Sequence, residues 1–367
     1  MKIKDLVRSN ILEIVPYTPP KPIKEIEREL NIRDITLLMS NENPRSASQE
    51  VIQAIQNELN NINRYPEGGA FYLRKALAKK LKVMPQNIIL GNGGDEILSM
   101  ICETFLNPEE EVIIGQPSFS AYEIFCRISG GKPVFVNLNN YTYDLNKIIK
   151  KINSRTKIIF ICNPNNPTGT IVTQNEVEYF LKHVPPRIIV VLDEAYMEYV
   201  ENNEFPNSIE FIKKRYENII SIRTFSKIYS MAGLRIGYGI SSFEIIKYLN
   251  LVRKPYNVNS LAQAGALASI LNPKIITQSR RINQEGKKYL YDSFEKMGFF
   301  YVPTEANFIL VRVGNNARLI CEKLLSNSLL VRSGVAIGYP EFIRVTIGLD
   351  EENKKFIKSL SKIKDYL

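Results

Sequence analysis

The sequence has one histidine, no tryptophan and few cysteines, and these shortages exclude several kinds of active site. A zinc site built on several imidazoles is excluded, and a Ser–His–Asp triad would depend on His183 alone. We interpret His183 as a solvated side chain at a helix end or in a loop. The cysteines form no CxxC pair, and we expect them to be buried thiols in a reducing cytoplasm. They are Cys102, Cys126, Cys162 and Cys321.

Long hydrophobic runs are absent as well. The longest runs, such as residues 188–192, have the length of a strand, whereas a membrane-spanning helix needs about 20 apolar residues. Residues 1–10 carry mixed charge and lead into no apolar segment, so we expect no secretory signal. These features exclude a membrane span and favour a cytoplasmic protein without a membrane partner.

Charge of one sign is only moderately in excess. The 48 lysines and arginines face 38 acids, which gives a net charge of +10. A basic chain can attract nucleic acid, but acids interrupt the basic residues here, as in residues 21–29. The lysines of residues 354–364 are typical of the polar face of a helix. We therefore expect no nucleic-acid partner, and the charge suits small phosphates and carboxylates equally well.

Strand-like and helix-like segments alternate from residue 35 onward, which predicts an α/β fold with a mostly parallel sheet. The predicted strands are residues 88–90, 112–114, 134–136, 157–162, 188–192, 219–222 and 238–240, and the predicted helices are residues 95–105, 120–129 and 176–183. Beyond residue 253 a long helical region, 260–297, precedes strands at 307–313, 329–332 and 343–348 and a helix from about residue 351. This second pattern predicts a smaller α+β domain.

The length of 367 residues suits about two domains. Prolines punctuate the first part of the chain, which predicts a segment that packs over another part of the protein. We expect an N-terminal arm at residues 1–34, a large domain at 35–254 and a small domain at 255–367.

Polar clusters follow two of the predicted strands, at the edge where parallel sheets bind ligands. The first is GNGGDE at residues 91–96, whose glycines expose backbone N–H groups to phosphate at a helix start. Glu96 stands where a dinucleotide fingerprint needs its third glycine, so a bare turn remains an alternative. The second is DEAY at residues 193–196, where an ionised Asp193 would keep a nearby ring nitrogen protonated, or would cap a helix. No histidine lies nearby, so we expect no transition metal.

Two more clusters offer ligand groups. The segment RTFSKIYSMAGLR at residues 223–235 places hydroxyls beside Lys227 and an arginine farther on, and hydroxyls with arginine bind phosphate. A buried lysine beside a second cation has a lowered pKa and can form a Schiff base. The segment NPNNPTG at residues 163–169 offers side-chain amides between rigid prolines, or is only a turn.

Together these segments resemble the fold-type I pyridoxal-phosphate (PLP) aminotransferases. The resemblance covers residues 15–360, and the motifs at 163–169, 193–196 and 226–235 occur in the order and at spacings that this family has. It implies a large PLP-binding domain with a mostly parallel seven-stranded sheet, a smaller α+β domain, PLP as the cofactor and a homodimer as the active form.

The resemblance also implies a role for each motif residue. Lys227 would carry the cofactor as a Schiff base and then act as the base of proton transfer. Asp193 would pair with the ring nitrogen, and Phe119 would stack on the ring. Asn166 and Tyr196 would form hydrogen bonds to the ring oxygen. The phosphate would be held by Gly94, Asp95, Thr224, Ser226 and Arg235, and by Tyr65 of a neighbouring subunit.

Within the family the chain is most similar to members that act on L-histidinol phosphate. The segments that carry this similarity are residues 16–17, 40–44, 64–66, 223–227, 253–259 and 343–348. It implies amino transfer from histidinol phosphate to 2-oxoglutarate, giving imidazole-acetol phosphate and glutamate, in histidine biosynthesis. Arg344 and Arg332 would bind the substrate anions because two guanidinium groups suit two negative charges. Asn43 would contact the substrate, and Tyr17 would close over the site.

Other activities stay open at this point. An aromatic aminotransferase, acting on phenylalanine, tyrosine or a precursor, shares these motifs, and residues 333–340 (SGVAIGYP) occur in both groups. A threonine-phosphate decarboxylase would keep Lys227 and the arginines but release CO2. A PLP-binding regulator without activity and a nucleic-acid-binding protein are the alternatives from other classes.

Overall fold

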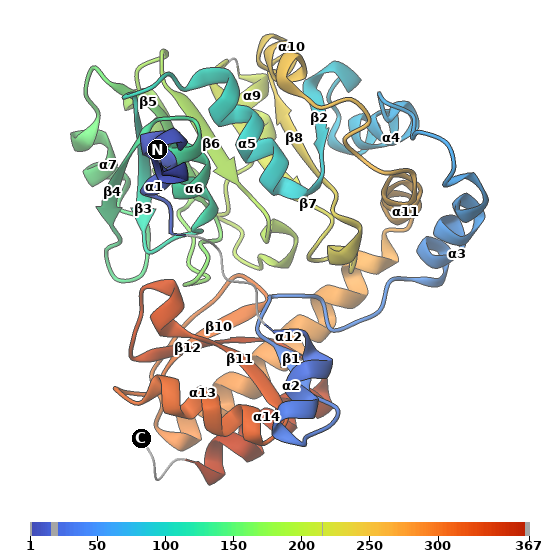
Figure 1. Cartoon of the computed structure of the whole chain (residues 1–367), viewed down its shortest axis with the longest axis vertical. Helices are drawn as coiled ribbons and strands as arrows, with labels where there is room; N and C mark the ends of the chain where they lie inside the picture. The colour runs from blue at the N-terminus through green and yellow to red at the C-terminus, as the bar shows by residue number, and fades with distance from the viewer. Residues whose placement is uncertain (1, 16–20, 215, 364–367) are drawn as a thin grey trace.

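The computed structural model describes residues 2–15, 21–214 and 216–363, which form two bodies around two β-sheets (Figure 1). The larger body contains a sheet of seven strands and the smaller a sheet of five. The long helix α12 (Lys274–Met297) runs from one body into the other. The α/β fold predicted from the sequence is confirmed.

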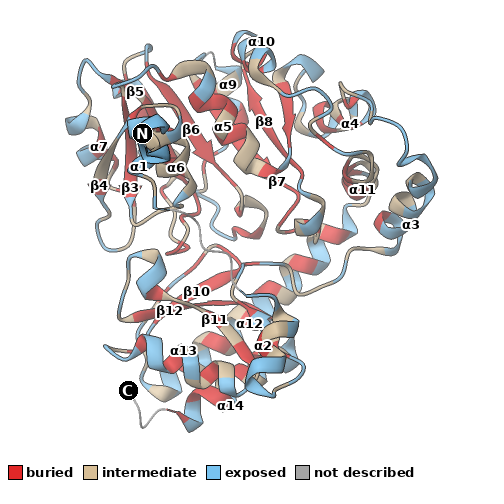
Figure 2. Ribbon diagram, in the orientation of Figure 1, coloured by how far each residue is buried: buried red, intermediate tan, exposed pale blue. Residues whose placement is uncertain are grey.

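The large sheet has the strand order β2-β8-β7-β6-β5-β3-β4. Its strands are β2 (Ile88–Gly91), β3 (Glu111–Gln116), β4 (Lys132–Asn137), β5 (Thr156–Cys162), β6 (Ile189–Asp193), β7 (Ile219–Thr224) and β8 (Gly237–Ser241). Only β8 runs against its neighbours, and the other paired strands are parallel. Every residue of β6 and β7 is buried (Figure 2). Burial along the whole length is typical of strands that are covered by helices on both faces.

Helices that follow the strands cover this sheet. They are α5 (Gly93–Phe105), α6 (Ala121–Ile128), α7 (Leu145–Lys151), α8 (Gln174–His183), α9 (Ser208–Lys213) and α10 (Phe243–Val252). The sequence sets their first turns, as in α8, where Glu176 Oε2 accepts from Thr173 N at 2.7 Å and Thr173 Oγ1 accepts from Glu176 N at 3.4 Å. His183 ends this helix and is exposed, as the sequence indicated.

The region predicted as continuously helical, residues 260–297, is two helices. α11 (Ser260–Leu271) ends at Asn272, and α12 begins after Pro273. Proline disfavours helical backbone in the residue before it and lacks an N–H group, so the helix breaks there. α11 packs against α3 (Gln49–Glu58) and α4 (Phe71–Leu81), far from them in the sequence.

The second sheet has the order β1-β11-β12-β10-β9. Its strands are β1 (Thr36–Leu38), β9 (Tyr301–Val302), β10 (Phe308–Arg312), β11 (Leu329–Ser333) and β12 (Phe342–Thr346), and helices α12, α13 (Ala317–Ser326) and α14 (Asp350–Lys362) share its core. Residues 36–38, which the sequence analysis placed in the large domain, pair in parallel with β11 here. A run of three residues does not indicate which sheet it will join, since only tertiary packing decides this.

The N-terminal segment contacts both bodies. α1 (Ser9–Leu12) lies against α6, and the Arg127 NH1 group forms an ion pair with Glu13 at 2.5 Å. α2 (Ile23–Leu30) lies beside the smaller body (Figure 1). Tyr17, expected to close over the site, lies outside the described residues.

The described part of the chain contains no helix with both the length and the apolar character that a bilayer span needs. The four cysteines are free thiols. Three of them are buried as expected, whereas Cys321 is partly exposed.

Candidate active site

A cavity of about 530 Å³ lies between the carboxyl edge of the large sheet and the second sheet. Side chains from both bodies line it, so neither body forms it alone. The predicted site residues that line it are Gly94, Asp95, Phe119, Asn166, Asp193, Tyr196, Thr224, Ser226, Lys227, Arg235, Arg332 and Arg344. Residues chosen from four separate motifs therefore meet in one place.

Two predicted residues do not line this cavity. The Asn43 Nδ2 group donates to Ile228 O at 3.0 Å and to Ser279 Oγ at 2.9 Å, so its amide serves local structure. Tyr65 is 81% exposed and stacks on Tyr256, with ring centroids 4.6 Å apart. A contact from Tyr65 to a second subunit, as the resemblance implies, stays a prediction.

Asp193 ends β6 at the floor of the cavity and is buried. Its carboxylate accepts from Tyr122 OH at 2.7 Å and from Ala195 N at 3.2 Å. Burial raises the pKa of Asp193 to about 6, although these two hydrogen bonds oppose the rise. No lysine or arginine of the described chain forms an ion pair with it. A cationic ligand group beside Asp193 would restore its charge.

The next residue of the same motif forms a buried ion pair that the sequence analysis did not identify. Glu194 Oε2 accepts from Arg223 Nε at 2.9 Å, from Ser221 Oγ at 2.7 Å and from Ser208 Oγ at 2.9 Å. These bonds tie the end of β6 to β7 directly behind the cavity. The pair satisfies both charges within the protein, so it is structural support for the site.

Lys227 follows β7 and reaches into the cavity. Its Nζ donates to Ser40 O at 3.2 Å and lies 5.6 Å from the centre of the Tyr196 ring. Burial, together with the nearby guanidinium groups of Arg344 and Arg235, lowers the pKa of Lys227 to about 8. A substantial fraction of the amine is therefore neutral near pH 8, as a nucleophile or a base must be.

Tyr196 is buried opposite this lysine, and its hydroxyl accepts from Asn41 Nδ2 at 3.0 Å. Burial raises the pKa of Tyr196, so the hydroxyl keeps its proton. Asn41 lines the cavity, while the sequence analysis had chosen Asn43 from the same segment. Asn41 has a φ of 55°, which turns the chain between the two asparagines. The sequence pattern does not show which of two nearby asparagines faces a site.

Phosphate-binding groups converge at one end of the cavity. α5 begins there with Gly93 and Gly94, and its first N–H groups have no partners within the helix. Gly93 has a φ of 80°, and a Cβ on it would lie 2.5 Å from Arg235 NH2, so only glycine fits. Arg235 NH2 also contacts Asp95 Oδ2 at 3.2 Å. The hydroxyls of Thr224 and Ser226 complete a set of donors that suits a phosphate group.

The second sheet contributes two arginines to the opposite side. Arg332 on β11 and Arg344 on β12 are partners in the antiparallel register. Arg344 is only 7% exposed, and its guanidinium donates to Asn166 Oδ1 at 2.5 Å and to Met39 O at 2.7 Å. Burial lowers the pKa of Arg344 to about 10, and Arg332 adds to this effect.

Neither arginine forms an ion pair with a carboxylate of the described residues. The buried Nε of Arg344 has no hydrogen-bond partner among the described residues either. A buried cation without a counter-ion is unfavourable, so these side chains are suited to bind an anion from outside. The cavity thus has groups suited to a phosphate and a carboxylate suited to a cation on one side, and groups suited to an anion on the other.

Comparisons with known proteins agree with this arrangement. The family model described as aminotransferase class I and II matches residues 33–360. The chain is 48% identical to the histidinol-phosphate aminotransferase of Moorella thermoacetica, covering 97% of this chain and 92% of that protein. It is 44% identical to the histidinol-phosphate aminotransferase of Caldicellulosiruptor saccharolyticus, covering 98% and 100%.

The fold is similar to that of a solved structure. The crystal structure of histidinol-phosphate aminotransferase from Sinorhizobium meliloti, in complex with pyridoxal-5'-phosphate, matches with a TM-score of 0.89. The match covers 98% of each chain at 23% sequence identity, so it supports the fold and not the substrate.

Proposed function

Since the chain belongs to the aminotransferase class I and II family, we propose that it transfers the amino group of L-histidinol phosphate to 2-oxoglutarate. The products would be imidazole-acetol phosphate and glutamate. The observation that carries this proposal is the pair of arginines without counter-ions, Arg344 and Arg332, which face Lys227 across one cavity. The two relatives at 48% and 44% identity support the choice of substrate.

The cofactor that we propose is pyridoxal phosphate, and the residues present fit it. Asp193 is a buried carboxylate without a cation, which suits a protonated ring nitrogen. The α5 turn, Thr224, Ser226 and Arg235 suit its phosphate, and Phe119, which lines the same cavity, would stack on the ring. When bound, this cofactor withdraws electrons from the substrate carbon next to the transferred nitrogen.

The side chains of the cavity would act on that substrate carbon. Lys227 would hold the cofactor through its Nζ, and once displaced by the substrate amine it would take the proton from that carbon. The Tyr196 hydroxyl, held by Asn41, and the Asn166 amide would bind the ring oxygen. Arg344 donates to Asn166 at the cofactor end of the cavity and is itself part of the anion site at the substrate end. It therefore connects the two ends.

Both substrates of the reaction would use the same arginines. Histidinol phosphate has a phosphate and no carboxylate, whereas glutamate has two carboxylates. A buried guanidinium such as Arg344 can form two parallel hydrogen bonds to either kind of anion. One anion site would therefore serve both halves of the transfer in turn.

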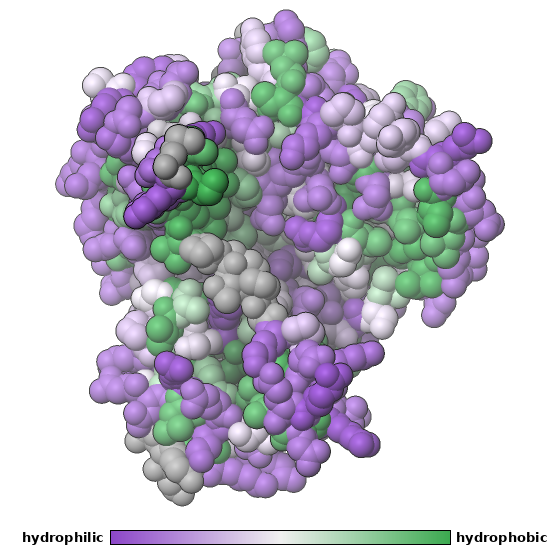
Figure 3. Space-filling model, viewed as in Figure 1, coloured by the Kyte–Doolittle hydropathy of each residue, from purple (hydrophilic) through white to green (hydrophobic). Residues whose placement is uncertain are grey.

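We propose that the active form is a homodimer. Apolar side chains are exposed on and beside α3 and α4, among them Ile52, Leu59, Ile62, Phe71 and Tyr72 (Figure 3). Tyr65 lies in the loop between these helices and would reach the phosphate of the partner subunit. Light scattering would test the assembly, because a monomer with full activity would contradict it.

A half-reaction tests the proposed substrate. The cofactor-loaded protein would be mixed separately with histidinol phosphate, phenylalanine, tyrosine and glutamate, and the loss of the bound cofactor's absorbance band would be followed. We expect fast conversion by histidinol phosphate and glutamate, and slow conversion by the aromatic acids. Comparable rates with phenylalanine or tyrosine would instead assign an aromatic aminotransferase. Release of CO2 from threonine phosphate would assign a decarboxylase.

A further inference from the structure

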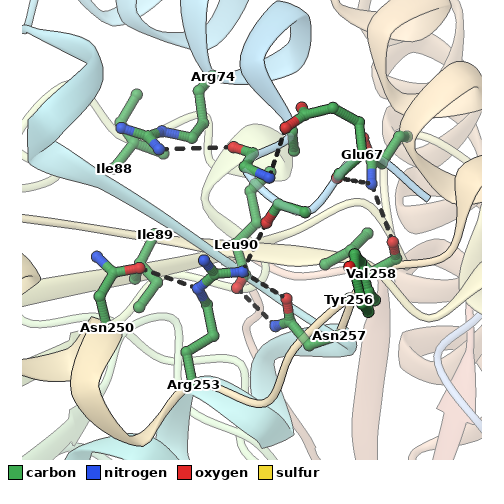
Figure 4. A pocket seen from close by; sticks show the side chains of 14 residues that line it. Glu67, Arg74, Ile88, Ile89, Leu90, Asn250, Arg253, Tyr256, Asn257 and Val258 are labelled. Atoms are coloured by element: carbon green, nitrogen blue, oxygen red, sulfur yellow. Dashed lines mark hydrogen bonds between the residues drawn. The ribbon is translucent and has the colours of Figure 1, made fainter. Parts of the chain in front are cut away.

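A network of polar side chains lies outside the catalytic cavity, between the loop at residues 64–70 and the segment at residues 253–258 (Figure 4). It surrounds a space of about 10 Å³, which holds about one water molecule, so it is not a ligand site. It contains two arginines, Arg74 and Arg253, and neither forms an ion pair with an acid of the described residues. Their N–H groups donate to carbonyl and amide oxygens instead.

Arg253 connects the segment to the loop. Its NH1 group donates to Gly68 O at 2.8 Å and to Asn257 Oδ1 at 3.2 Å, and its Nε donates to Asn250 Oδ1 at 2.9 Å. One guanidinium therefore fixes the loop, the end of α10 and a second side chain of its own segment. A lysine has no planar arrangement of donors and would not make all of these bonds.

Asn257 connects the same segment to the start of α5. Its Nδ2 donates to Leu90 O at 3.0 Å and to Glu96 Oε2 at 2.7 Å. The same Glu96 oxygen accepts from Asn92 N at 2.6 Å, and Asn92 is the N-cap residue that immediately precedes α5. Asn257 thus holds the carboxylate that shapes the turn before Gly93, where the phosphate donors converge.

Tyr256 stands between these two residues in an unusual backbone conformation. Its φ is 56°, which costs a non-glycine residue about 1 kcal/mol. Its ring stacks on Tyr65, with an angle of 16° between the planes. Strained backbone of this kind persists where neighbouring bonds hold it, and it is concentrated at functional sites. Here Arg253 and Asn257 provide those bonds on either side.

We propose that Arg253 and Asn257 are positioning residues that hold the phosphate-binding turn of α5 and the Tyr65 loop in a fixed relation. The proposal rests on the proposed function for the identity of the phosphate, which belongs to the cofactor. Asn257 acts on the turn of its own subunit through Glu96. Arg253 acts on the loop whose tyrosine would reach the partner subunit. The segment therefore connects the phosphate sites of the two subunits.

Cofactor affinity tests the role of Asn257. The dissociation constants of pyridoxal phosphate and of pyridoxal, which lacks the phosphate, would be measured by fluorescence on the apoprotein. We expect Asn257→Ala to weaken the binding of pyridoxal phosphate about tenfold, because the variant loses a hydrogen bond to a charged group. The binding of pyridoxal should weaken less than about twofold. The matched control is Asn87→Ala, since Asn87 also bonds strand backbone, at Ser241 O, but stands at the opposite end of β2 from the start of α5.

Each outcome decides the matter. Equal losses for both ligands, or no loss for either, would overturn the positioning role of Asn257. If Asn257→Ala fails to fold, Asn257→Ser keeps a small polar group that is too short to reach Glu96, and the same comparison applies. A wild-type protein with no preference for the phosphate form would refute the proposed cofactor instead, which separates the two failures.

A double-mutant cycle tests the role of Arg253. Arg253→Lys should weaken pyridoxal phosphate binding several-fold with Tyr65 present, and add little when Tyr65→Phe has already removed the hydroxyl. Independent, additive losses would contradict an action through the loop. Arg187→Lys is the matched control, because Arg187 also donates to neutral oxygens of the chain, here Thr156 O and Asn153 O at the start of β5.

Discussion

The two sheets bring charge to the same cavity in different ways. At the edge of the large sheet, Glu194 and Arg223 are paired with each other and with two serines. At the edge of the second sheet, Arg332 and Arg344 lie side by side without a carboxylate among the described residues. The first edge compensates these charges within the protein, whereas the second is suited to bind anions from outside.

Asp193 and Lys227 share features of both edges. Both belong to the large-sheet side, yet neither forms an ion pair with another described residue. Burial shifts the pKa of each toward its neutral form, upward for the acid and downward for the amine. Asp193 and Lys227, which the proposed chemistry uses, are therefore left without an ion-pair partner among the described residues.

The largest effect is expected from Lys227→Ala. Removing the amine removes both covalent attachment and the proton-transfer base, so turnover should fall by at least about 10³-fold. Steady-state turnover and the absorbance of the bound cofactor would measure it. Lys80→Ala is the matched control, since burial also lowers the pKa of Lys80, but its Nζ donates to Tyr229 OH outside the cavity. Near-normal turnover of the Lys227 variant would refute the catalytic role of Lys227.

The anion side should respond next, through Arg344→Lys. A lysine cannot make the paired hydrogen bonds of a buried guanidinium, so kcat/KM should fall about 100-fold for both histidinol phosphate and glutamate. Arg312→Lys serves as the control, because Arg312 lies on the neighbouring strand and pairs with Glu341 at the surface. A loss confined to one substrate would refute the idea of a shared anion site.

The sequence was sufficient to place the large-sheet side of the site. Strand and helix alternation indicated the parallel sheet, and Asp193 and Thr224 then fell at strand ends that share one edge. The ion pair of Glu194 and Arg223 could not be predicted from the sequence, because sequence separation does not reveal which side chains of neighbouring strands face each other.

The second side of the site depended more on tertiary structure. Arg332 and Arg344 were identified only through a resemblance, and their pairing depends on an antiparallel register that no local pattern encodes. The choice of Asn43 over Asn41 failed to find the cavity-lining residue because a backbone turn separates them. The sheet that residues 36–38 join was unpredictable because only tertiary packing decides it.

Asp193→Asn should stabilise the apoprotein while it disables the enzyme. The folded pKa of about 6 lies above the reference value of 3.8, so the native state binds the proton more tightly than the unfolded state. Ionisation of Asp193 therefore lowers the free energy of unfolding progressively as the pH rises from about 3.8 to about 6, and the loss is complete above that pH. Urea unfolding should show little gain for the variant at pH 4 and a gain of about 3 kcal/mol at pH 8.

Asp144→Asn provides a control of opposite sign. The Lys147 N–H group and side chain hold the pKa of Asp144 below its usual value, against the effect of burial. Its carboxylate therefore stabilises the folded state above pH 4, and its loss should lower the free energy of unfolding. If Asp193→Asn also destabilises the apoprotein at pH 8, Asp193 is a structural residue whose charge is already compensated.

Arg332→Ala should have a smaller and selective effect. Arg332 is less buried than Arg344, so its loss should weaken doubly charged substrates about tenfold. Phenylalanine, which has one carboxylate, should lose less than about threefold. The ratio of kcat/KM for histidinol phosphate to that for phenylalanine measures this selectivity. An equal loss for both substrates would show that Arg332 does not distinguish them.

The smallest effect is expected from Asn43→Ala. Its amide bonds to Ile228 O and Ser279 Oγ and does not line the cavity. KM for either substrate should change less than about threefold, while the free energy of unfolding should fall by about 1 kcal/mol. A large rise in KM with unchanged stability would show that Asn43 contacts the substrate.

The central claim is that the arginines of the second sheet bind the anion of the substrate. The most direct test of this claim compares histidinol phosphate with histidinol. The two molecules differ only in the phosphate, so the ratio of their half-reaction rates measures what Arg344 and Arg332 contribute. We predict that kcat/KM for histidinol phosphate exceeds that for histidinol at least about 10³-fold. Comparable values would contradict the account, because the two arginines would then have no anion of the substrate to bind.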